Sequence, residues 1–280
     1  MGPQRSFPWW TVMRRVSALL FLALLIHASR PGVEWFRGTV AGTTVLGEVP
    51  FVDPLAALEV GLASRELMPT ALLGAGILAF VALLLGPVFC GWVCPLGLLL
   101  DLAQSVRAGV NRLLPARALP ALGLPRGVKY LVLAGALTFS VVTRLPVFQA
   151  FSPIQGLVRA VLYGAEVSLW FVGGILALEV IAPRLWCRSL CPLGALYAIL
   201  GRWAILRVRV DPDRAGEIKC QRCESSCPMG IEVMRRYALA GHSAVDHPDC
   251  TRCGACTEAC PNNVLRLGCR AIPSIEIQGR

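Results

Sequence analysis

The spacing of cysteines near the carboxyl end limits what this chain can fold into more than any other feature. Four cysteines follow one another as Cys250-x2-Cys253-x2-Cys256-x3-Cys260, with a proline directly after the last. Bacterial ferredoxins hold [4Fe–4S] clusters with this spacing, in which three cysteines wrap one cube and the fourth reaches a neighbouring cluster. CxxC pairs also suit tetrahedral zinc, but a run that ends in Cys-Pro is less typical of zinc sites. The spacing therefore predicts an iron–sulfur site.

A shorter cysteine run lies just before it and reads Cys220-x2-Cys223-x3-Cys227, again followed by proline. Aligned without gaps on the second run, it carries Glu217 where the first cysteine should stand. In two-cluster ferredoxins each cube takes three cysteines from one run and the fourth from the other. We therefore expect the two runs to fold together around two clusters.

This cross-ligation predicts one complete set of ligands and one set that is a thiolate short. The complete set is Cys227, Cys250, Cys253 and Cys256, and the incomplete set is Cys220, Cys223 and Cys260. Either Glu217, Cys269 or a membrane cysteine supplies the missing ligand, or this cluster is a [3Fe–4S] cluster. The sequence leaves these alternatives open.

The composition places the rest of the chain in a membrane. Of its 280 residues 55% are hydrophobic and only 16% are charged, and the mean hydropathy is +0.62. These values are typical of a polytopic membrane protein. The formal net charge is +10, but the sequence contains no Lys/Arg run with interleaved aromatic residues, which argues against nucleic-acid binding. An excess of basic residues in cytoplasmic loops explains the positive charge. Thiolate ligands survive best in a reducing compartment, which places the cysteine runs in the cytoplasm as well.

Four apolar segments predict four transmembrane helices. They cover about residues 16–26, 70–86, 128–142 and 165–182. Arginines before the first segment and between the second and third place both termini in the cytoplasm. The first segment is expected to be an uncleaved helix, because no A-x-A cleavage site follows it. Residues 30–69 and 143–163 are expected to form outer loops, with a hairpin or re-entrant piece at 43–52 and an x-Pro-aliphatic turn at 53–55 and at 152–154.

A CxxxCPLG motif occurs twice, with Cys187 and Cys191 following Cys90 and Cys94 by 97 residues. Each copy ends an apolar segment, which predicts a duplicated helix pair that brings both motifs to one membrane surface. Cysteines at i and i+4 share a helix face. The two pairs could hold a third four-iron cluster, supply ligands to the carboxyl-terminal clusters or act as a dithiol relay. Simple packing of small buried cysteines is the remaining alternative.

Other titratable residues give weaker signals. A membrane haem of type b needs a pair of intramembrane histidines, and only His27 lies near a predicted span, so haem is not expected. His27 and Glu179 are weak candidates for proton transfer, because ionisable residues in membrane helices are costly and often functional. The sequence has no Walker, Rossmann or Ser/His/Asp pattern, which argues against a hydrolase or a nucleotide-dependent enzyme.

With these motifs in order, the chain resembles the NapH/MauN family of ferredoxin-type membrane proteins over nearly its whole length. The resemblance rests on both CxxxCP motifs, on the two cysteine runs and on the segment 49–55. It implies an electron-transfer subunit in the bacterial inner membrane that passes electrons from the quinone pool toward a periplasmic reductase of the nitrate-reductase or methylamine-utilisation type. A partner ferredoxin or cytochrome subunit is implied as well. The first cysteine run departs from the family pattern, with three cysteines where four are usual.

The expected architecture is an α-helical polytopic membrane protein with a small ferredoxin-like lobe. Residues 1–206 would form the membrane domain with four transmembrane helices, and residues 207–280 a two-cluster α+β iron–sulfur domain. A second hypothesis of another class is a redox-sensing or maturation factor that uses its clusters for metal-centre assembly or regulation.

Overall fold

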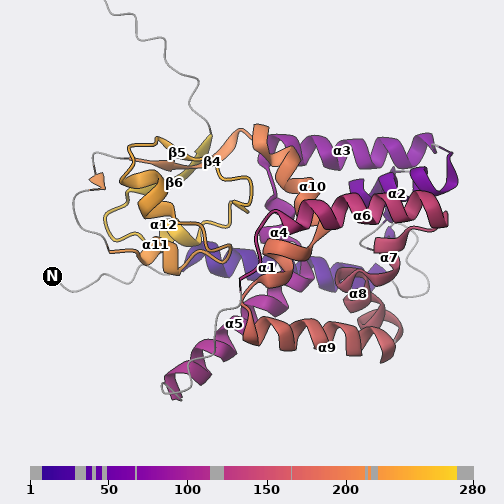
Figure 1. The fold of residues 1–280 in the computed structure, drawn as a ribbon, viewed down its shortest axis with the longest axis horizontal. Helices are drawn as coiled ribbons and strands as arrows, with labels where there is room; N and C mark the ends of the chain where they lie inside the picture. The colour runs from indigo at the N-terminus through magenta and orange to yellow at the C-terminus, as the bar shows by residue number, and fades with distance from the viewer. Residues whose placement is uncertain are drawn as a thin grey trace, which may run out of the picture.

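The structure is a computed structural model and describes residues 8–28, 36–39, 42–45, 49–66, 68–113, 123–164, 166–211, 214–215 and 220–269. Four apolar helices, here called the long helices, run along one direction, with a small lobe of strands and short helices at one end, while α5 (Pro95–Leu113), which is of similar length, runs obliquely to them (Figure 1). The long helices are α1 (Trp9–Ala28), α3 (Pro69–Leu85), α6 (Val128–Thr143) and α9 (Glu166–Ile181). Below, the helical part means residues 8–203 and the lobe means residues 206–269.

Contacts with the lobe give the direction of each long helix. Helix α1 begins at the lobe, where Glu258 accepts main-chain N–H groups of its first turn. Helix α3 ends beside the side chain of Arg252, and α6 begins beside Asp249. Helix α9 is followed by Cys187, which packs against the core of the lobe. The four helices therefore run alternately away from the lobe and toward it.

All four predicted helical segments are helical in the structure. Helix α1 is longer than its apolar run because no helix-breaking residue interrupts residues 9–15, and Glu258 satisfies N–H groups of its first turn. Among the described residues, one stretch, Trp9–His27, is long and apolar enough to cross a membrane. Helices α3 and α6 and the stretch 169–179 of α9 are apolar but shorter. Four membrane spans therefore remain a prediction.

The segments expected to be outer loops contain regular structure. Strands β1 (Phe36–Thr39), β2 (Gly42–Val45) and β3 (Val49–Val52) form an antiparallel sheet in the order β1-β2-β3. The hairpin expected at 43–52 is thus confirmed. Three unpredicted helices follow the x-Pro turns or lie beside them: α2 (Pro54–Ser64), α7 (Val147–Phe151) and α8 (Pro153–Tyr163).

The expectation that the x-Pro turns lie in outer loops is wrong. In each turn the proline occupies the first turn of an 11-residue helix, α2 or α8, where its missing N–H costs nothing. Leu55 and Ile154, which follow these prolines, are buried in one core cluster together with Cys94 and Cys191. The turns therefore lie inside the helical part, beside the cysteine motifs.

The remaining helices connect the long ones to the motifs and the lobe. They are α4 (Val88–Trp92), α5 (Pro95–Leu113), the π-helical turn η2 (Trp186–Leu190), α10 (Pro192–Leu200) and the 3-10 turn η3 (Gly201–Trp203). Helix α10 packs against α3 and α6, and α5 packs against α1 and α9. The two helices that follow the CxxxCP motifs thus lie between the long helices.

The lobe contains both strands and helices, as expected for an α+β domain. Its elements are β4 (Leu206–Val210), α11 (Arg222–Ser225), η5 (Met234–Ala238), β5 (Ala244–Val245), α12 (Ala255–Ala259) and β6 (Leu265–Cys269). The strands form an antiparallel sheet in the order β5-β4-β6. Val208 pairs with Val245 and Leu267 across this sheet, and the lobe has its own apolar core around these strands.

Candidate iron–sulfur sites

The two cysteine runs of the lobe fold alike. Helix α11 follows Gln221, with φ 51°, and helix α12 follows Gly254, with φ 74°. Both residues have a left-handed backbone conformation, and each comes directly after a cysteine, Cys220 or Cys253. Helices α11 and α12 contact each other. The gapless alignment of the two runs therefore corresponds to a structural repeat.

Four cysteines of the lobe line one cavity. Cys250, Cys253 and Cys256 come from the second run, and Cys227 comes from the first. Apolar side chains of β4 and β5 complete the wall. Desolvation raises the pKa of the Cys250 thiol to about 11, so metal loading must drive the loss of its proton. The four residues are those that cross-ligation predicts for the complete cluster.

The cysteines of the incomplete set also lie near one another. Desolvation raises the pKa of the Cys223 thiol to about 11, and the neighbouring Cys220 and Cys260 add to the shift. Cys269 lies at the exposed end of β6, where it pairs across the sheet with Leu206. Glu217 lies outside the described residues. The fourth ligand of this set therefore stays open.

The arrangement suits a cluster better than a single ion. Among the residues that the structure describes, no three His, Cys, Asp or Glu side chains come close enough to hold one metal ion. A cube separates its ligands, because each cysteine binds a different iron. The cavity between Cys227 and the second run brings four thiols around one point. The residues present therefore fit a [4Fe–4S] cluster.

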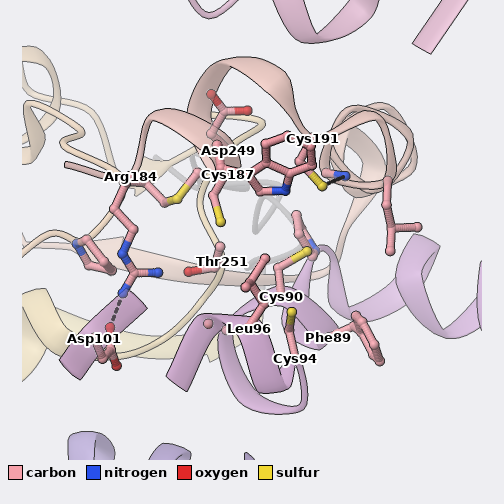
Figure 2. Close-up of a pocket in the computed structure, with 18 of the residues that line it drawn as sticks. Phe89, Cys90, Cys94, Leu96, Asp101, Arg184, Cys187, Cys191, Asp249 and Thr251 are labelled. Atoms are coloured by element: carbon pink, nitrogen blue, oxygen red, sulfur yellow. Dashed lines mark hydrogen bonds and ion pairs between the residues drawn. The ribbon is translucent and has the colours of Figure 1, made fainter. Parts of the chain in front are cut away.

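A second cavity lies where the helical part meets the lobe. All four motif cysteines line it, with Cys90 and Cys94 on one side and Cys187 and Cys191 on the other (Figure 2). Thr251, from the second cysteine run, also reaches this space. We call it the motif cavity. The prediction that both motifs come together is confirmed.

The two motifs have matching backbone geometry. The N–H of Cys94 donates to the carbonyl oxygen of Phe89 at 2.9 Å, and the N–H of Cys191 donates to that of Trp186 at 2.8 Å, five residues earlier in both cases. The following proline then begins α5 or α10. Cys191 is the N-cap of α10, and its Sγ accepts the N–H of Gly194 at 3.3 Å. A thiolate at this position is favoured by the helix dipole.

Charged side chains also line this cavity, although none of them was assigned to it from the sequence. The cations are Arg14, Arg15, Lys129 and Arg184, and the carboxylates are Asp101 and Asp249. Asp101 pairs with Arg14 at 2.6 Å and with Arg184, and Lys129 pairs with Asp249. Asp101 is the one acid in the basic segment 95–126, where the sequence pattern used it only as part of the charge bias. The cations outnumber the carboxylates, so the lining favours an anionic occupant.

The lobe is held directly against the first motif. The indole N–H of Trp92 donates to the carbonyl oxygen of Arg252 at 3.2 Å. A Cβ on Gly91 would lie 2.8 Å from the carbonyl oxygen of Thr251. The buried guanidinium of Arg252 in turn donates to main-chain carbonyls of η3 and β4, at 3.0 and 3.2 Å. Thr251 and Met229 line both the lobe cavity and the motif cavity, so the two spaces are neighbours.

The two weak proton-transfer candidates lie in different settings. Glu179 is 1% exposed, so it is not solvated, and it accepts the main-chain N–H groups of Arg184 and Trp186, the latter at 3.0 Å. It therefore stabilises the turn that leads into the second motif. His27 lies exposed in the last turn of α1, at the end that points away from the lobe. The structure gives Glu179 a positioning role and leaves a proton-transfer role for either residue a hypothesis.

Comparisons with known proteins agree with the cysteine patterns. Residues 67–112 and 164–210 each match the family described as a 4Fe-4S binding domain, and residues 218–265 match the family described as a 4Fe-4S dicluster domain. No solved structure matches the chain. The protein thus carries iron–sulfur domains.

Curated relatives extend over nearly the full chain. The ferredoxin-type protein NapH of Haemophilus influenzae is 34% identical, over 95% of this chain and 94% of its own length. The methylamine utilization ferredoxin-type protein MauN of Methylorubrum extorquens is 29% identical, over 96% and 92%. NapH of Escherichia coli is 29% identical, over 93% and 90%. The chain belongs to the NapH/MauN family of ferredoxin-type proteins.

Proposed function

We propose that this protein transfers electrons from membrane quinol, through two iron–sulfur clusters in the lobe, to a partner protein. The observation that carries the proposal is the lobe cavity lined by Cys227, Cys250, Cys253 and Cys256, located at one end of four alternating apolar helices. Iron–sulfur domains and the family assignment support the electron-transfer role.

The apolar surface of the long helices supports a membrane location with four spans. Large apolar side chains stand 69 to 83% exposed on α3, α6 and α9, as at Leu73, Leu131, Val142 and Trp170. Soluble proteins rarely leave such faces in water, whereas lipid covers them. Two matches to one family, each containing a CxxxCP motif, support a duplicated helix pair. We assign residues 1–206 to the membrane domain and residues 207–280 to the iron–sulfur domain.

The lobe and both termini are proposed to face the cytoplasm of the bacterial cell. Reduced thiols and the basic residues near the lobe end of the helices favour that side. Reporter fusions at Gly109 and Gly279 should behave as cytoplasmic. Periplasmic reporter activity at either position contradicts this orientation.

Each lobe site would be held by its own set of thiolates. Cys227, Cys250, Cys253 and Cys256 complete one cube, while a second site uses Cys220, Cys223 and Cys260. A bound cluster accepts and releases one electron at a time. Apolar side chains around the first site exclude water, and the N–H of Ile231 points to Cys227 Sγ at 3.4 Å. Both features tune the reduction potential of a bound cluster.

Quinol supplies two electrons and releases two protons on oxidation, so one quinol could reduce two lobe sites in turn. The acceptor that we propose is a reductase system of the nitrate-reductase or methylamine-utilisation type, reached through a partner ferredoxin or cytochrome subunit. The family assignment supports this pathway. Glu179 and His27 are the residues that we would test for taking up the released protons.

Anaerobic membranes that contain the full chain test this proposal. Addition of a reduced quinone analogue should bleach the visible absorbance of the clusters. Trp170→Phe, at an exposed position of α9, is the control and should bleach as the wild type does, whereas Cys256→Ser should show less cluster absorbance even before quinol is added. If dithionite bleaches the clusters but the quinol analogue does not, quinol is not the donor. The redox-sensing or maturation role would then be the better explanation.

A further inference from the structure

A groove lies where the lobe joins the helical part, and it shares no described lining residue with the lobe cavity or the motif cavity. Its wall comes from α10 and η3, from the start of α6, and from β4 and β5 of the lobe (Figure 1). Three arginines line it, Arg202, Arg207 and Arg209, and Asp246 is the one carboxylate among its described lining residues. We call this space the arginine groove.

Strand β4 separates the arginine groove from the lobe cavity. Side chains of a strand point alternately to its two faces. Val208 accordingly lines the lobe cavity, whereas Arg207 and Arg209 line the groove on the other face of the strand. The two arginines therefore point away from the cysteines of the lobe cavity, and the negative charge of a cluster there is not their direct partner.

The arginines of the groove have no anionic partner within the part of the chain that the structure describes. Arg207 is 6% exposed, and its guanidinium donates to the main-chain carbonyl oxygens of Ala204 and Arg202, at 3.1 and 2.7 Å. None of the ion pairs between described residues involves an arginine of the groove. A buried charge without a counter-charge is costly. Arg209 also lies directly across the sheet from Arg266, where like charges repel. An anion in the groove would offset both costs.

The groove lies at the level where the apolar helices meet the lobe. Ile199 and Trp203 line it and are 42 and 62% exposed, and Tyr130 lines it from the first turn of α6. Tryptophan and tyrosine at the ends of apolar helices are typical of the head-group layer of a membrane. Basic pockets between transmembrane helices on the cytoplasmic side bind the head groups of anionic lipids. The groove therefore joins a cationic wall to a surface that lipid would cover.

We propose that the arginine groove binds the phosphate head group of an anionic phospholipid. The phosphate would lie against Arg202, Arg207 and Arg209, and the apolar part of the lipid against Ile199. Arginine suits this role because its planar guanidinium donates two parallel N–H groups to a phosphate. A soluble anion or an acidic protein surface would match the charge but would leave the apolar residues of the groove without a contact. The inference rests on the membrane location proposed above and not on quinol as the donor.

Titration of the full chain in neutral detergent with short-chain phosphatidylglycerol, followed by native mass spectrometry, tests the proposal. One phosphatidylglycerol should be retained per chain, and phosphatidylcholine with the same acyl chains should bind at least about tenfold more weakly. Inorganic phosphate, added as a competitor, should displace the lipid only at far higher concentration, because it has no apolar part. Equal binding of the two lipids overturns the proposal. Competition by inorganic phosphate at the concentration of the lipid would show that the groove takes a soluble anion instead.

Two exposed arginines of the groove give a variant that should keep the fold. Arg202→Gln with Arg209→Gln should weaken the binding of phosphatidylglycerol about tenfold or more and leave that of phosphatidylcholine unchanged. The matched control is Arg214→Gln with Arg235→Gln, because these side chains are 55 and 57% exposed and do not line the groove. Cluster absorbance checks that both variants fold. Binding of phosphatidylglycerol that is unchanged in the groove variant, or weakened equally in the control, overturns the proposal.

A charge-conserving variant tests the buried arginine. Arg207→Lys keeps the positive charge and should retain more phosphatidylglycerol binding than Arg207→Gln. Equal loss in both variants would show that the charge of Arg207 does not bind the head group. If Arg202→Gln with Arg209→Gln binds lipid normally but passes fewer electrons to the partner, the groove docks an acidic protein instead. None of the lipid titrations uses quinol, so their failure leaves the proposed function standing, and a failed quinol test leaves this lipid site standing.

Discussion

Trp92, inside the first CxxxC motif, donates its indole N–H to the carbonyl oxygen of Arg252, 3.2 Å away and between two cysteines of the lobe. The side chain of Arg252 is fully buried and donates to main-chain carbonyls of the helical part and of β4. The two cysteine-bearing loops are therefore fixed to each other. Changes at this contact should act on the motif and on the lobe together.

Removal of the Trp92 donor should weaken the attachment of the lobe. Trp92→Phe keeps the ring but leaves the carbonyl oxygen of Arg252 without this bond, at an expected cost of about 1 kcal/mol. Thermal unfolding of the full chain in detergent measures it. Trp203→Phe, at a 62% exposed position, is the control and should have no effect. Equal shifts in the two variants would show that the hydrogen bond contributes nothing.

The ion pair between Lys129 and Asp249 should be far more costly to break than to replace. Both side chains are buried, so Lys129→Met leaves a buried carboxylate without a partner and should cost about 3–5 kcal/mol. The double variant Lys129→Met with Asp249→Asn should recover part of that loss. Glu232→Ala breaks the exposed pairs with Arg235 and Arg236 and should cost about 1 kcal/mol or less. A double variant less stable than Lys129→Met would contradict this account.

Gly91 is predicted to be needed for the close approach of the first motif to the lobe. A Cβ there would meet the carbonyl oxygen of Thr251 at 2.8 Å, so Gly91→Ala should cost about 1–3 kcal/mol and lower the iron content. Gly135→Ala in α6 is the matched control, because a Cβ there meets nothing within 4 Å. Iron analysis and thermal unfolding compare the two variants. Similar behaviour of both would mean that the contact with Thr251 is not tight in solution.

Features that depend on short sequence distances could be predicted from the sequence. The set of cysteines that line the lobe cavity follows from their spacing around two short helices, and the alignment of the two runs placed Cys227 beside the second run. The long helices follow from apolar runs without breakers. In both cases neighbouring residues specify the structure.

Features that depend on tertiary packing could not be predicted from the sequence. Helices α2 and α8 each start with a proline after a loop-like sequence, so the sequence did not predict them. Only the structure shows that they are buried against the motif cysteines. Asp101 pairs with Arg14 and Arg184, which lie 87 and 83 positions away in the sequence, and no local pattern predicts such partners. Glu179 was a weak candidate for proton transfer, and its contacts with the main chain of the following turn could not be predicted from its place in the helix. The polar wall of the motif cavity was therefore missed.

The central claim is that both cysteine runs of the lobe jointly build two cluster sites, and electron paramagnetic resonance of single variants tests it most directly. Cys227→Ser and Cys253→Ser lie in different runs, yet both should lose the same cluster signal. Cys223→Ser and Cys260→Ser should both lose the other one. Thermal unfolding of each variant controls for a general loss of structure. If Cys227→Ser instead loses the signal that Cys223→Ser loses, each run holds its own cluster and the account is contradicted.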